Sequence, residues 1–204
     1  MRSDFIRIVS NGNNIDTALN EVEKVAAYKG LSGKNALHLR LLGEEMMGLM
    51  RSITGETKGV FWIEETDDLY ELHLKVETLV DSKIRKQLLA TSRSGKNEAS
   101  KSLMGKLMEF FYRDANEDIA AFSASPLLTG GISHEAGIPM TDWQWSMMRY
   151  VDKHNSDPNP SEAEKEAWDE LEKSVVSHVA DDVKISIKGW ETEMILEKKI
   201  TALA

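Results

Sequence analysis

The sequence predicts an α+β fold: a two-layer sandwich in which a mostly antiparallel sheet carries helices on one face, together with a helical insertion. Apolar residues recur at helical spacing in 15–26 and again in 37–53. They alternate with polar residues in 72–76 and in 183–187, as in strands with one buried face. Both kinds of segment within 204 residues indicate helices packed against a sheet.

The N-terminal part is expected to form one strand and two helices. Residues 5–9 are apolar enough for a short strand, and the helix that follows ends at Gly30. Ser32 is expected to cap the next helix, which ends at Gly55. So many positions of this second helix are apolar that we expect it to lie buried beneath the sheet.

A hairpin and a loop–helix unit come next. The hairpin spans 60–76, with its turn in 64–68. A basic helix is expected at 81–91, a glycine-containing loop at 92–97, and an amphipathic helix at 99–112.

Glycines and prolines interrupt the chain after residue 112, which predicts a helical insertion at 113–182. The sandwich would then comprise 1–112 and 183–204, closed by a C-terminal hairpin. Inside the insertion we expect a short helix that begins at Thr141. A capping box predicts a long acidic helix from 161 to about 179.

The composition argues against several classes of function. Cysteine is absent, which excludes a thiol nucleophile, thiolate metal ligands and disulfides. The net charge of −9 argues against nucleic-acid binding, which needs clustered cations. No apolar run approaches the ~20 residues of a membrane span, so we expect a cytoplasmic protein that does not enter a membrane.

The buried helix carries Glu45 in the segment LLGEEMMGLMRSI, the hairpin ends near Glu77, and the loop SRSGKN precedes a helix. This order resembles the ATP-binding domains of histidine kinases and anti-sigma-factor kinases, the GHKL or HATPase superfamily. The resemblance covers 15–112 and resumes at 183–196.

The resemblance implies roles for individual residues. Glu45 falls where the family has a catalytic glutamate, but it could instead lie on the helix surface like Glu44. Leu49 replaces the asparagine that holds magnesium in the family, which argues against a magnesium site. Glu77, with Asp81 as the alternative, falls near the aspartate that contacts adenine.

The loop is expected to bind phosphate groups through its backbone amides and cations, although a solvated basic turn is the other interpretation. Its expected nucleotide-binding residues are Arg93, Ser94, Gly95, Lys96, Asn97 and, in the following helix, Gly105. The five histidines share no recognised metal-binding spacing, so no metal site is predicted.

Two functions follow from these residues. The first is a regulatory protein that binds another protein on a degenerate, anti-sigma-factor-like scaffold, with ATP as the expected nucleotide and a homodimer as a further assembly. The second is an active ATP-dependent serine kinase or ATPase in which Glu45 is the general base and Lys96 compensates at the phosphates.

Overall fold

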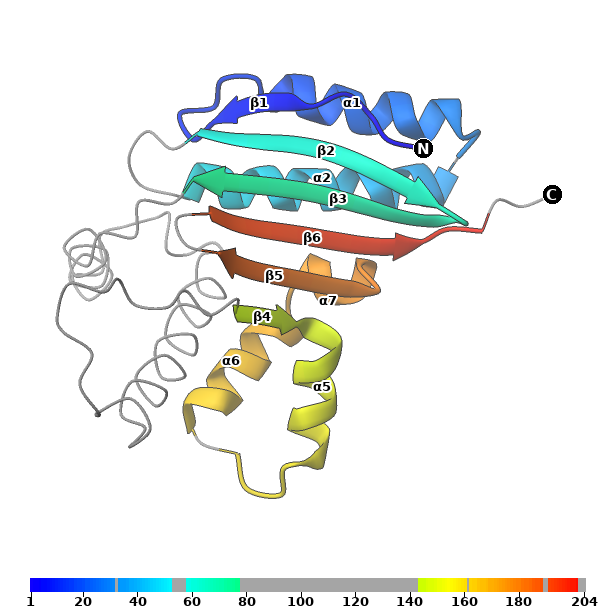
Figure 1. The fold of residues 1–204 in the computed structure, drawn as a ribbon. Helices are drawn as coiled ribbons and strands as arrows, with labels where there is room; N and C mark the ends of the chain where they lie inside the picture. The colour runs from blue at the N-terminus through cyan, green and yellow to red at the C-terminus, as the bar shows by residue number, and fades with distance from the viewer. Residues whose placement is uncertain (32, 53–57, 78–142, 161, 189–190, 202–204) are drawn as a thin grey trace, which may run out of the picture.

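The computed structural model describes residues 1–31, 33–52, 58–77, 143–160, 162–188 and 191–201 (Figure 1). Strands and helices make up most of these segments. In chain order they are β1 (Ile6–Val9), α1 (Ile15–Tyr28), α2 (Gly33–Ser52), β2 (Lys58–Thr66), β3 (Leu69–Glu77), β4 (Trp143–Ser146), α5 (Met147–Ser156), α6 (Glu162–Glu172), α7 (Val175–Val179), β5 (Asp182–Lys188) and β6 (Glu191–Lys199).

The strands form one six-stranded sheet in the order β1-β2-β3-β6-β5-β4, and every neighbouring pair is antiparallel. Figure 1 shows α1, α2 and α7 behind the sheet, on one of its faces. The opposite face carries none of the described helices and is called the open face below. The prediction of an α+β protein with an antiparallel sheet is confirmed.

The core lies between the sheet and the helix layer. Every second residue of β2 from Gly59 to Glu65 is buried, which is the period expected of a strand with one face against the core. The α2 helix contributes Leu39, Leu42 and three methionines to this core, as the sequence predicts. At Gly43 it passes so close to α1 that an added Cβ would lie 3.0 Å from Val22.

The hairpin between β2 and β3 is tighter than predicted. Only Asp67 and Asp68 form the turn, and both have positive φ, of 51° and 67°. Two residues with positive φ are what a type I′ turn requires, and aspartate tolerates this conformation better than most residues. Glu64, Glu65 and Thr66, expected in the turn, therefore belong to the strand.

The short helix expected after Thr141 is observed from Met147 to Ser156 as α5, whereas Trp143–Ser146, expected inside it, is strand β4, paired with β5. An unpaired edge of β5 and a sequence rich in tryptophan both favour the strand. The region 113–182 therefore contains a strand of the main sheet as well as helices. The division of the chain into 1–112 with 183–204 and an insertion stays a prediction.

The long acidic helix predicted for 161–179 is two helices, α6 and α7. The chain turns at Ser174, whose hydroxyl accepts a hydrogen bond from the Ser177 amide at 2.9 Å and so caps α7. This break allows Val176 and Val179 to join the common core. The α7 helix therefore packs into the same core as α1, α2 and the sheet.

Candidate functional site

Glu45 lies on α2 with its side chain half buried. Burial, and then the neighbouring charge of Glu44, raise the pKa of the Glu45 carboxyl above its usual range. Glu44 points outward and pairs with Arg40, whose Nε lies 2.8 Å from Oε1 of Glu44. Of the two adjacent glutamates, Glu45 is therefore the more buried one.

The end of α2 lies beside the ends of the hairpin strands. An added Cβ at Gly59 of β2 would lie 2.9 Å from Val76 Cγ1 and 3.3 Å from Met50 Cε. Val76 directly precedes Glu77, the last residue of β3. In the sequence, Leu49 precedes Met50 and Glu77 follows Val76. The two predicted positions therefore lie at the same end of the sandwich.

The predicted phosphate loop lies outside the described residues. This applies to Arg93, Ser94, Gly95, Lys96, Asn97 and Gly105, and also to Asp81. Their roles stay predictions, as does the role assigned to Glu77, of which only the strand position is described.

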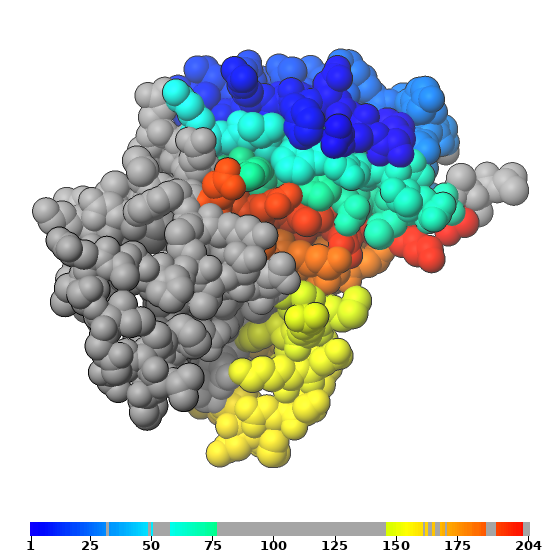
Figure 2. Space-filling view, viewed as in Figure 1, coloured from blue at the N-terminus to red at the C-terminus, as the bar shows by residue number. Residues whose placement is uncertain are grey.

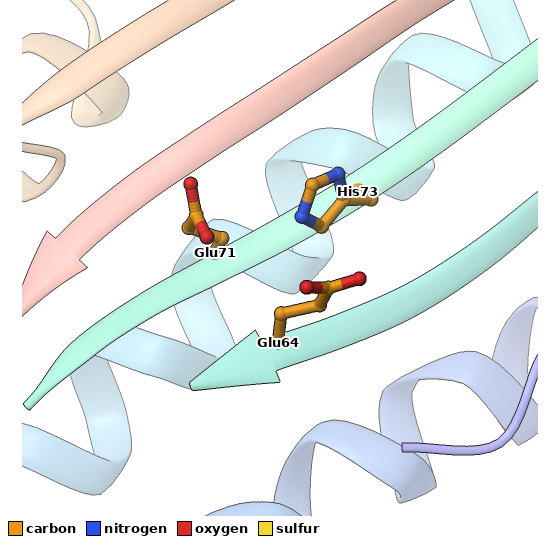
Figure 3. Close-up of side chains that lie close together, drawn as sticks. All are labelled: Glu64, Glu71 and His73. Carbon is orange, nitrogen blue, oxygen red and sulfur yellow. The ribbon is translucent and has the colours of Figure 1, made fainter. Parts of the chain in front are cut away.

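A second group of side chains gathers on the open face, and it was not predicted from the sequence. Glu64 of β2 and Glu71 of β3 are directly paired across the hairpin, and His73 lies two residues along β3 on the same face. One ligand atom from each of the three side chains lies within 4.8 Å of the others. Figure 3 shows a ring nitrogen of His73 turned toward the space between the two carboxylates.

The imidazole of His73 is held in place from two sides. Its ring stacks on Trp62, with centroids 4.6 Å apart and an interplanar angle of 9°. Nδ1 lies 3.2 Å from Oε1 of Glu193 on β6. Within the described part of the chain, Nε2 is buried and has no hydrogen-bond partner. A buried ring nitrogen without a partner is unusual and costs free energy.

The two carboxylates of the group have different surroundings. The indole Nε1 of Trp62 donates a hydrogen bond to Oε1 of Glu64 at 3.0 Å. Glu71 lies directly opposite Glu197 on β6. Burial is the main cause that raises the pKa of the Glu71 carboxyl; the nearby His73 opposes the rise and the charge of Glu197 adds to it. Glu197 is itself paired with Lys184.

A signal for this group is present in the sequence, but only once the hairpin register is known. Counting outward from a two-residue turn at Asp67 and Asp68 pairs Glu64 with Glu71. The wider turn predicted for 64–68 places Glu64 outside the strand, which hides the pairing. His73 is the residue that then completes the group on the same face.

None of the helices in the described segments is both long and apolar enough to cross a membrane. A comparison of the chain with family models, with curated proteins and with solved structures finds no match.

Proposed function

We propose that this chain is a regulatory protein that acts by binding another protein, on a scaffold of the anti-sigma-factor type whose nucleotide chemistry has degenerated. One observation carries the proposal. The α2 helix runs without interruption through Glu45 and Leu49, so these positions lie one turn apart on the same side of the helix. A leucine at the second position offers no oxygen to magnesium.

The arrangement of the elements also supports the proposal. The helix pair α1 and α2 precedes the β2–β3 hairpin, and the C-terminal hairpin of β5 and β6 adds to the same sheet next to β3. A Cβ added at Gly59 would meet both Met50 and Val76, so the end of α2 lies near the end of β3. In the family that the sequence resembles, the ligand lies between the helices and the sheet.

The test is a titration of the full chain with ATP and ADP, with and without magnesium, followed by thermal shift and by phosphate release. We expect no magnesium-dependent turnover. The substitution Leu49→Asn is expected to make nucleotide binding depend on magnesium, with Leu49→Ala as the control for loss of the side chain. Affinity capture followed by native mass spectrometry is expected to identify a bound protein. Magnesium-dependent turnover by the unmodified chain would reject the proposal.

The second candidate is an active ATP-dependent kinase or ATPase, and the environment of Glu45 favours it. A half-buried carboxyl with a raised pKa is a stronger base than an exposed glutamate, as a general base needs to be. In this case Glu45→Gln abolishes ATP turnover, whereas Glu44→Gln leaves it unchanged because Glu44 lies on the surface. Equal effects of the two substitutions would exclude Glu45 as the general base.

A further inference from the structure

Acidic residues face one another in an uninterrupted row across four strands. Glu64 of β2 pairs with Glu71 of β3, Glu71 pairs with Glu197 of β6, and Glu197 pairs with Asp182 of β5. Like charges directly opposite each other destabilise a sheet. Asp182 is occupied by hydrogen bonds to Ser146 and Met148, and Lys184 compensates Glu197. The Glu64 and Glu71 end of the row is left with an excess of negative charge.

His73 lies beside Glu64 and Glu71 and offers a nitrogen ligand in addition to their oxygens. It is only 8% exposed, and its unpartnered Nε2 is buried. With the proton assigned to Nδ1, where it can be donated to Glu193, Nε2 presents a lone pair. Figure 3 shows a ring nitrogen directed at the space between Glu64 and Glu71. The buried Nε2 of His73 and the carboxylates of Glu64 and Glu71 therefore converge on one space. Among the described residues, no cationic side chain forms an ion pair with either carboxylate there.

We propose that Glu64, Glu71 and His73 bind a divalent transition-metal ion of the zinc class on the open face of the sheet. Imidazole nitrogen combined with carboxylate oxygen suits zinc, manganese or iron(II), whereas calcium and magnesium prefer oxygen alone. Two ligand atoms bound to one tetrahedral zinc ion at about 2.1 Å lie about 3.4 Å apart. The present separations of up to 4.8 Å close on an ion through rotation of the glutamate side chains between their rotamers.

His73 and Glu64 have the kind of support that metal ligands have in proteins. Glu193 orients His73 through Nδ1, as carboxylates do for metal-binding histidines. Trp62 donates to Glu64 and also stacks on the His73 ring. Glu71 lies directly opposite Glu197 on β6, so two carboxylates adjoin the proposed ion. All three ligands sit on the central strands β2 and β3, which is a rigid placement compared with a loop. Figure 2 shows atoms of β2, β3 and β6 on the face of the molecule turned to the viewer.

The experiment is calorimetric titration of the chelator-treated full chain with zinc, with magnesium and calcium as comparison ions. We expect one zinc ion per chain, bound at least roughly 100-fold more tightly than magnesium or calcium. His73→Gln and Glu71→Gln are each expected to weaken zinc binding by more than about 100-fold. Glu193→Gln acts through His73 and is expected to weaken it by about 10- to 100-fold.

Two matched variants control for charge and for histidine count. Glu191→Gln removes an exposed carboxylate from β6, and His154→Gln removes a histidine from α5; neither is expected to change zinc affinity. Cobalt(II) provides an independent measurement, since its visible spectrum reports nitrogen and oxygen ligation and should be lost in Glu64→Gln. If His73→Gln does not fold, Glu64→Gln and Glu71→Gln decide the result. Absence of zinc binding, or an affinity unchanged in the ligand variants, overturns the proposal.

Discussion

The carboxylate of Asp182, at the start of β5, accepts a hydrogen bond from the backbone amide of Met148 in the first turn of α5, with Oδ1 and N 3.0 Å apart. The same carboxylate accepts the hydroxyl hydrogen bond of Ser146, which precedes the helix. Asp182 is only 4% exposed. One buried side chain therefore joins the edge strand β4, the helix α5 and the strand β5.

The substitution Asp182→Ala is expected to lower the free energy of unfolding by about 1–3 kcal/mol, because it removes an acceptor at the start of α5 and leaves partly buried donors without a partner. Denaturant unfolding followed by circular dichroism measures the change. Asp169→Asn, at an exposed position of α6, serves as the control and should change stability by less than about 0.5 kcal/mol. A similar loss in both variants would refute the capping role.

Gly59→Ala and Gly48→Ala are expected to have opposite effects on stability. At Gly59 the new methyl group would lie 2.9 Å from Val76 Cγ1 and 3.1 Å from the Lys75 carbonyl oxygen, so overpacking should cost about 1–3 kcal/mol. At Gly48, inside α2, no atom of the described residues lies within 4 Å, and alanine should stabilise the helix by about 0.5–1 kcal/mol. Thermal unfolding of both variants under one condition gives the comparison. A Gly59→Ala protein as stable as the parent would show that β2 and β3 separate easily at this point.

The ion pair between Lys29 and Glu65 predicts a loss of stability in acid. Nζ of Lys29 lies 2.5 Å from Oε2 of Glu65, and this hydrogen bond holds the pKa of the Glu65 carboxyl below its usual value of 4.5. A carboxyl with a lowered pKa in the folded state stabilises that state above pH 4.5, and the contribution is lost as the pH falls through the lowered value. Stability measured from pH 7 down to pH 2 should decline less in Glu65→Gln than in the parent chain. An identical decline would assign acid unfolding to other carboxyls.

The metal-free chain is expected to become more stable at pH 7 when Glu71 is replaced by glutamine. Burial, and the neighbouring Glu197, raise the pKa of Glu71, so its carboxyl opposes folding once it is ionised. A raised pKa in the folded state means that stability falls as the pH rises from about 4.5 through the raised value. Urea unfolding in the presence of a chelator, at pH 5 and at pH 7, should show that the gain from Glu71→Gln is larger at pH 7. Glu191→Gln, an exposed substitution on β6, provides the comparison.

Within the residues that the structure describes, the sequence by itself determined most of the secondary structure; the helices predicted at 81–91 and 99–112 lie outside them. The helical spacing of Ile15, Leu19 and Val22 predicts α1, and the strict alternation around Ile185 predicts β5; both elements are observed. These patterns are reliable because each repeats with the period of its own element and separates a buried face from an exposed one. The buried α2 could also be anticipated, since too many of its residues are apolar for a surface helix.

Tertiary contacts decided the rest. Trp143–Ser146 forms a strand because it pairs with the edge of β5. The acidic segment is divided at Ser174, which caps α7, and this break lets Val176 pack into the core. The group of Glu64, Glu71 and His73 exists only through the exact register of the hairpin. A single-residue shift in that register would move these side chains to different faces, and local sequence preferences are too weak to select one register among several.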